Sequence, residues 1–217
     1  MAFPLKPPKE WFSTPEADRP TPLTFDQDGR VQGHLALWGQ CHTGFLNGAL
    51  SECVSAPRSS DGYASFHLGT LETADGEDVQ VGKVTYDTQH APLAANMQAA
   101  ARHYDDTGRV GAFVRAVDGR IGIWLSGAVR SDIPAEGFRD LRANPPSGDW
   151  RMLRRGLELI ASLSVPVPGF PIAHPQLSLA ASGKAYTLIL PGYADEPEEL
   201  RSRAFLRKRA MIASTLS

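Results

Sequence analysis

The chain has 217 residues, a formal net charge of −2, 42% hydrophobic and 21% charged residues. These values predict a soluble globular protein with one domain and arms, or at most two small domains, and they exclude a strong basic field directed at nucleic acid. Two cysteines cannot form a disulfide framework, so we expect reduced thiols in an intracellular protein. We expect neither a secretory signal nor a membrane span, since no apolar run approaches about 18 residues.

The first 24 residues are rich in proline, which fixes φ and removes backbone donors. We therefore expect residues 1–24 to form an extended arm, attached to the domain through Trp11 and Phe12. Residues 25–193 are expected to form the main domain, and residues 194–217 a helical tail.

Several segments combine apolar or β-branched residues with flanking turn signals, a pattern typical of strands. They are residues 30–38, 63–71, 79–86, 110–117, 121–129, 157–167 and 185–190. Helical spacing instead predicts helices over residues 92–104, 133–142 and 195–211. The expected fold class is α+β, a β-rich closed or half-closed barrel with two or three flanking helices.

Three residues form a candidate hydrolytic site: His103 at a predicted helix end, Ser147 in a Pro-Pro-Ser-Gly turn, and Glu158 at the start of an apolar strand. A serine hydroxyl needs a base, histidine is the usual one, and a third group must orient the imidazole. The plain alternative is a surface histidine and an ordinary turn serine. His90 is the substitute base, and Ser164 is the second nucleophile to test.

The cysteines allow other interpretations. Cys41, His42, Cys53 and His67 are all metal-ligand types, yet they lack the close Cys-x-x-Cys pairing of common zinc sites. We expect no metal or cofactor, and two reduced, partly buried thiols. A thiol protease pair of Cys41 with His90 or His103 has no sequence signal in its favour.

From His103 onward the chain resembles the prohead (capsid maturation) proteases of tailed phages, which are distant relatives of the herpesvirus assemblins. The residues that match that family's pattern are His103 with Asp105 and Asp106, Gly111, Asp118-Gly119, Gly122–Gly127, Gly137–Leu141, Ser147–Trp150 and Glu158–Pro168. Gly33–Gly39 with Cys41-His42 resembles a branch from phages of actinobacteria. The resemblance covers about residues 20–175.

The resemblance implies a serine endopeptidase with His103 as general base, Ser147 as nucleophile and Glu158 as third member. The oxyanion hole would come from backbone N–H groups near Gly148 or from one of three arginines, Arg151, Arg154 and Arg155.

The implied substrates are the N-terminal arms of the major capsid protein, the scaffold, and the protease's own tails. The implied place of action is the host cytoplasm, inside the assembling prohead, with no nucleic acid or membrane partner and with a homo-oligomer left open. The alternative is a catalytically inactive protein of this fold that serves as a structural capsid or assembly component.

Overall fold

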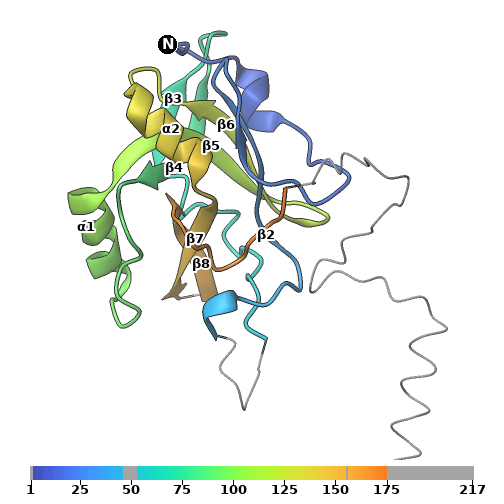
Figure 1. The fold of residues 1–217 in the computed structure, drawn as a ribbon, viewed down its shortest axis with the longest axis vertical. Helices are drawn as coiled ribbons and strands as arrows, with labels where there is room; N and C mark the ends of the chain where they lie inside the picture. Colours follow the sequence, from blue (N-terminus) through green and yellow to red (C-terminus); the bar gives the residue numbers. More distant parts are fainter. Residues whose placement is uncertain (1, 46–52, 155, 175–217) are drawn as a thin grey trace, which may run out of the picture. The chain divides into compact units, whose positions relative to one another are not determined.

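The structure, a computed structural model, describes residues 2–45, 53–154 and 156–174 (Figure 1). The strand predicted at residues 185–190, the helix predicted at 195–211 and the boundary predicted at 193/194 lie outside the described residues.

The core of the molecule is an eight-stranded sheet with the order β1-β2-β6-β5-β4-β8-β7, in which β3 pairs with β4 outside this path. Neighbours are antiparallel except β4 and β8, which run parallel. The strands are β1 Thr24–Phe25, β2 Arg30–Leu37, β3 Gly69–Glu72, β4 Asp78–Tyr86, β5 Arg109–Asp118, β6 Gly122–Val129, β7 Pro146–Leu153 and β8 Gly156–Ser164.

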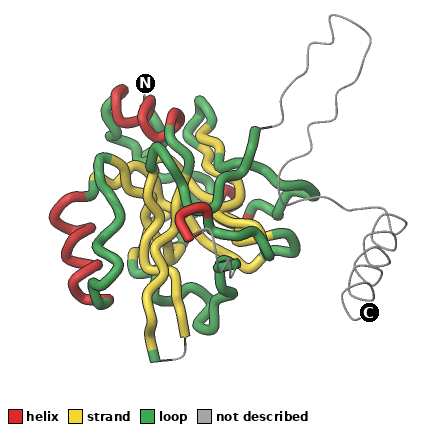
Figure 2. The backbone as a smooth tube through the Cα atoms, turned by 60° about the horizontal axis from the view of Figure 1, so that its bottom comes forward, coloured by secondary structure: helices red, strands yellow, loops and turns green. Residues whose placement is uncertain are grey.

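The sheet curls on itself (Figure 2). As a result β2 approaches β7, although several strands lie between them in the sheet order. The curl encloses an apolar core, in which β6 is buried along its whole length. The predicted α+β class with a half-closed, β-rich barrel is confirmed at this level.

Two α-helices flank the sheet. Helix α1 spans Met97–Thr107, and the side chain of its N-cap Asn96 accepts from the Ala99 N–H at 2.9 Å. Helix α2 spans Ala135–Ala143 and buries Phe138 and Leu141. Helix α1 was predicted over residues 92–104 but begins only at Met97, because Asn96 caps its N-terminus and the residues before the cap form a loop. Neither helix is long and apolar enough to cross a membrane.

The stretch around Ser147 differs most from the sequence-based prediction. It was expected to be a turn, but β7 begins at Pro146 and pairs along its length with β8. Proline is tolerated here because β7 is the last strand of the sheet order, where one side of the backbone needs no ladder partner. The predicted strand at 63–71 is reduced to Gly69–Glu72, since turns precede it.

The N-terminal arm is packed on the domain. It contains a short 3₁₀ helix, η1 Lys9–Ser13, and buries Phe12 against Val79, Val81 and Ala128. Glu16 ties the arm to β2 and β6, because its carboxylate lies 2.9 Å from His34 Nε2 and accepts from the Gly122 N–H at 3.1 Å. These hydrogen bonds hold the pKa of Glu16 below its usual value, although burial opposes them.

The arm also limits which residue can occupy position 33. Gly33 has φ +149°, and a Cβ there would lie 2.4 Å from both Pro22 O and Leu23 Cα.

We expect Gly33→Ala to lower the free energy of unfolding by about 2–4 kcal/mol, because backbone strain and the clash with the arm act together. Urea unfolding measures it. Gly76→Ala is the control: φ there is +75°, but no described heavy atom lies within 4 Å of the added Cβ, so about 1 kcal/mol is expected. Equal losses would contradict the packing argument.

Candidate active site

Ser147 lies near the start of β7, opposite Leu163 of β8, and is 3% exposed. Side chains on a strand alternate between its two faces, so Ser147 shares a face with the next odd-numbered residues. Those residues are Asp149 and Arg151, both buried. The first half of β7 therefore presents three polar side chains in a row on one face.

The residue at hydrogen-bond distance from Ser147 is His90. Its Nε2 lies 2.9 Å from Ser147 Oγ. His90 stands in the loop between β4 and α1 and is an exposed residue. Burial of part of the ring lowers the pKa of His90 below 6.5; Asp149 opposes this shift and Arg151 adds to it. His90 is therefore neutral near pH 7, as a general base must be before it accepts a proton.

His103, the base expected from the sequence, does not hold this position. It lies inside α1, one turn from the helix end, and its Nε2 is 2.8 Å from the carbonyl oxygen of Gln89. That bond attaches His103 to the residue before His90, not to the serine. The structure thus pairs Ser147 with the histidine that precedes the helix, which sequence reasoning ranked second.

Glu158 is also placed away from Ser147. It lies near the start of β8, opposite Arg151, about 13 Å along the hairpin from Ser147 at strand spacing. Its two carboxylate oxygens accept from Ser59 Oγ at 2.7 Å and from the Ser60 N–H at 2.9 Å. Glu158 therefore anchors the 59–60 segment at the far end of the hairpin.

A buried ion pair stands beside the Ser147–His90 pair. Arg151 Nη2 donates to Asp149 Oδ2 at 2.8 Å, and the two side chains are 8% and 7% exposed. The hydroxyl of Tyr104 on α1 donates to the same carboxylate oxygen and accepts from the Ala91 N–H at 3.0 Å. Burial and the bond to Asp149 raise the pKa of Tyr104, so it remains protonated.

The Arg151 guanidinium also holds the loop that carries His90. Its nitrogens donate to four carbonyl oxygens, those of Ala91 at 3.1 Å, Pro92 at 3.1 Å, Leu93 at 3.2 Å and Ala95 at 2.9 Å. The planar, always charged guanidinium suits this divergent set of acceptors. Arg151, expected as an oxyanion donor, is instead committed to the loop. Arg154 is exposed and Arg155 lies outside the described residues.

Gly169, after the end of β8, forms another wall of the site. Its N–H donates to Ser147 Oγ at 3.3 Å. The carbonyl of Gly169 accepts from the Thr43 N–H at 2.9 Å, and Thr43 Oγ1 lies 3.2 Å from Pro168 O. The segment that follows β8 is thus bonded on one side to the serine and on the other to the segment that follows β2.

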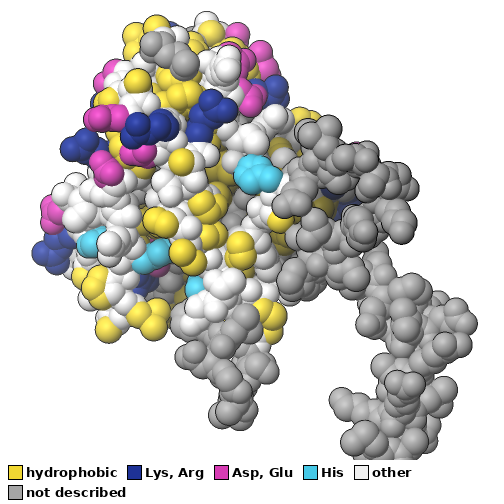
Figure 3. Space-filling view, viewed as in Figure 1, with side chains coloured by type: hydrophobic (Ala, Val, Ile, Leu, Met, Phe, Trp, Pro, Cys, Tyr) yellow, Lys and Arg dark blue, Asp and Glu magenta, His cyan; other side chains and the backbone are white. Residues whose placement is uncertain are grey.

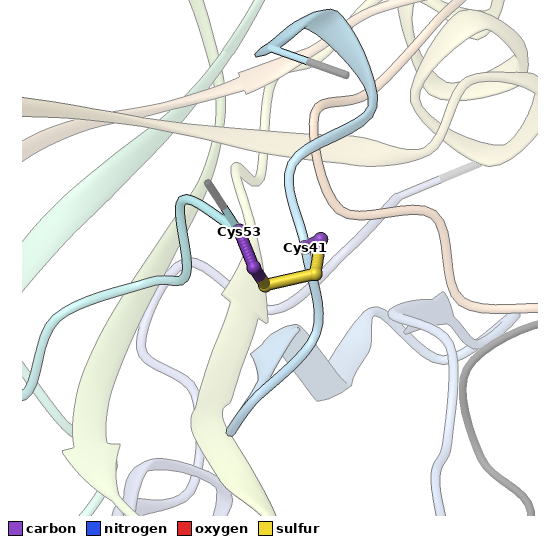
Figure 4. The surroundings of a disulfide bond; sticks show 2 residues. All are labelled: Cys41 and Cys53. Atoms are coloured by element: carbon purple, nitrogen blue, oxygen red, sulfur yellow. A yellow bond between two sulfur atoms is a disulfide. The ribbon is translucent and has the colours of Figure 1, made fainter. Parts of the chain in front are cut away.

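A disulfide closes this second segment. Cys41 and Cys53 are bonded to each other, with their Cα atoms 4.9 Å apart (Figure 4). The His42 N–H donates to Val54 O at 2.8 Å, which brings the two cysteines together. The expectation of two reduced thiols is therefore wrong for this structure, because Cys41 and Cys53 lie within bonding distance of each other.

The other candidates of the sequence have structural partners. His67 Nε2 accepts from the Ala116 N–H at 2.8 Å, and burial lowers the pKa of His67 to about 4. Ser164 Oγ donates to Asn144 O at 3.2 Å. Among the described residues, no three His, Cys, Asp or Glu side chains gather as metal ligands.

Histidine side chains reach the surface near α1 and the β7–β8 hairpin, among mostly hydrophobic and uncharged side chains (Figure 3). Exposed residues there include Leu93 and Met97, at 80% and 37%. Charged side chains gather mainly over the part of this face that carries α2. An uncharged, partly apolar surface in this region suits the approach of a peptide segment.

Sequence reasoning missed Gly169, whose N–H contacts Ser147, and His42, which lies against Gly169. It also missed the bonded pair of Tyr104 and Asp149. One signal was present: Ser147, Asp149 and Arg151 repeat with a period of two, which is typical of one polar strand face. Comparison of the chain with known protein families, with curated proteins and with solved structures finds no match.

The Asp149–Arg151 pair yields a stability prediction. Arg151→Met leaves a buried carboxylate without its cation, so we expect a loss of about 3–5 kcal/mol in the free energy of unfolding. The double variant Asp149→Asn, Arg151→Met is expected to lose less than the sum of the two single variants. Chemical denaturation of the four proteins measures the coupling. The exposed Arg154→Met is the matched control, with a change within about 0.5 kcal/mol. If Arg151→Met lost as little stability as this control, the Asp149–Arg151 pair would have no energetic role.

Proposed function

We propose that the chain is a serine endopeptidase of phage capsid maturation, with Ser147 as nucleophile and His90 as general base. The observation that carries the catalytic part is the 2.9 Å contact between His90 Nε2 and Ser147 Oγ. A nucleophile and a base within hydrogen-bond reach are the minimum that acyl transfer requires.

The biological setting rests on the sequence resemblance to prohead proteases, and the β-rich half-barrel is compatible with it. On this proposal the substrates are capsid-protein arms, scaffold and the chain's own tails, cleaved inside the prohead in the host cytoplasm. The finer assignment of the barrel to the assemblin type belongs to the same proposal.

The proposed reaction is an acyl transfer through a covalent acyl-enzyme. Ser147 Oγ attacks the scissile carbonyl carbon, its proton passes to His90 Nε2, and the carbonyl π electrons move to the oxygen. Collapse of this tetrahedral species reforms the C=O bond and expels the amine, which takes the proton from His90. Water then attacks the acyl-enzyme, gives a proton to His90 and releases the acid, and Ser147 recovers its proton.

In this proposal the loop between β4 and α1, and not Glu158, orients the base His90. Arg151 holds the carbonyls of residues 91–95, and Asp149 balances its charge. Asp149 also favours the imidazolium that forms when His90 takes the serine proton, since a nearby anion raises the pKa of His90. Asp149 and Arg151 are therefore positioning residues in this proposal.

The assignment is tested by two single variants, their double variant and one control variant. We expect Ser147→Ala and His90→Gln each to lower the cleavage of co-expressed capsid protein by about 10⁴-fold, with the double variant no worse, because nucleophile and base act as a unit. His103→Gln is the control and is expected to stay within about threefold of wild type. Mass spectrometry of the capsid and scaffold proteins gives the readout.

Three outcomes would contradict the proposal. Processing by Ser147→Ala at the wild-type rate would redirect the search to Ser164, and loss of activity only in His103→Gln would restore His103 as the base. A wild-type chain that joins the capsid and cleaves nothing would favour the structural-component alternative.

The pH dependence follows from the sign of the His90 shift. Only neutral His90 accepts the serine proton, and burial lowers its pKa below 6.5. We therefore expect the rate of Ser147 labelling by a fluorophosphonate to rise with pH through a pKa below 6.5 and to level off by about pH 7. The curve of His103→Gln is expected to overlay that of wild type. A flat profile, or a midpoint above 7, would argue against His90 as the base.

A further inference from the structure

The proposed reaction leaves one requirement without a residue, namely donors for the oxyanion that forms on the substrate. Such donors must lie about 2.7–3.1 Å from the place where the charge develops, next to the attacking oxygen. The Gly169 N–H contacts Ser147 Oγ at 3.3 Å, so it lies next to the attacking oxygen as such a donor must.

A second N–H group stands against Gly169. A Cβ built on Gly169 would lie 2.1 Å from His42 Nε2, so the edge of the imidazole occupies the space that a side chain would take. Because Cβ and N are bonded to the same Cα, His42 Nε2 lies within about 4.6 Å of the Gly169 nitrogen. Two donors that share one oxygen at about 3 Å can be up to about 6 Å apart, so one oxyanion can accept from both.

The tautomer of His42 is set by its other nitrogen. Nδ1 accepts from the Gly44 N–H at 3.0 Å, so a neutral ring carries its proton on Nε2. Burial and the proximity of His90 both lower the pKa of His42, which favours the neutral form. His42 Nε2–H is thus a neutral donor, which stabilises a developing anion without competing for the proton of Ser147.

The backbone holds both donors firmly. The Thr43 N–H to Gly169 O bond joins the two segments at 2.9 Å, and the His42 N–H to Val54 O bond fixes the other side at 2.8 Å. The Cys41–Cys53 disulfide closes the segment next to His42. Donors held in this way need no reorganisation during the reaction, which is the source of their catalytic effect.

We infer that the Gly169 N–H and His42 Nε2–H together form the oxyanion site of this enzyme, an inference that rests on the proposed serine hydrolase function. His42, to which the sequence analysis assigned no catalytic role, then becomes a catalytic residue that touches the reacting carbonyl oxygen.

The test measures the second-order rate constant for labelling of Ser147 by diisopropyl fluorophosphate, a small reagent that needs no substrate recognition. Its phosphoryl oxygen takes the place of the oxyanion. We expect His42→Leu to lower the plateau rate by about 10²-fold or more without moving the pKa of the pH profile. His42→Gln, which retains an N–H donor, is expected to stay within about tenfold of wild type. His174→Gln, an exposed histidine, is the control.

A second variant tests the same site from Gly169. Gly169→Ala places a methyl group against His42 Nε2 and is expected to reduce labelling as His42→Leu does, with no further loss in the double variant. Circular dichroism melting checks folding. If His42→Leu does not fold, His42→Gln and Gly169→Ala decide the matter.

The outcomes separate this inference from the function on which it rests. A wild-type protein that is not labelled, or a Ser147→Ala variant labelled equally well, overturns the serine hydrolase proposal itself. Wild-type labelling with an unchanged plateau in His42→Leu overturns only the oxyanion assignment. A shifted pKa of the pH profile in both His42→Leu and His42→Gln would instead make His42 an orienting partner of His90, and would also overturn it.

Discussion

The arrangement of the site depends on one buried charge, the guanidinium of Arg151. A buried arginine is costly unless its donors are satisfied. Here the two terminal nitrogens donate to Asp149 and to four loop carbonyls, and Nε lies 2.8 Å from Asp149 Oδ1 in the ion pair. The result is a rigid connection between β7, which carries Ser147, and the loop after β4, which carries His90. Strand and loop are distant in sequence, and neither could place its residue against the other without such a connection.

Backbone contacts complete the site on its other side. The segment after β8 contacts the serine through the Gly169 N–H, and the segment after β2 contacts Gly169 through Thr43. These connections are available because the sheet curls until β2 approaches β7. A flat sheet with the same strand order would keep those two segments apart, so the half-barrel is what brings His42 near Ser147.

Glu158 shows how a sequence signal can be real and still be assigned the wrong partner. A buried glutamate at the start of an apolar strand does need a polar environment, and it finds one in Ser59 and Ser60. Strand geometry then separates it from Ser147 by most of the hairpin. His103 is a similar case, because its helical position directs it to Gln89 O and leaves Ser147 to His90.

The sequence by itself determined the β-rich α+β class, most of the strands, both described helices and Ser147 as the candidate nucleophile, because these follow from local periodicity and residue chemistry. It did not determine β7, whose Pro-Pro-Ser-Gly start has the composition of a turn and becomes a strand through pairing with β8. The pairing of Ser147 with His90 instead of His103, the contact of Tyr104 with Asp149, and the Cys41–Cys53 bond were decided only by the tertiary structure. Each of these contacts joins segments that lie apart in the chain, and local sequence does not relate such segments. Their proximity depends on how the strands pair and on which side of the sheet each loop crosses.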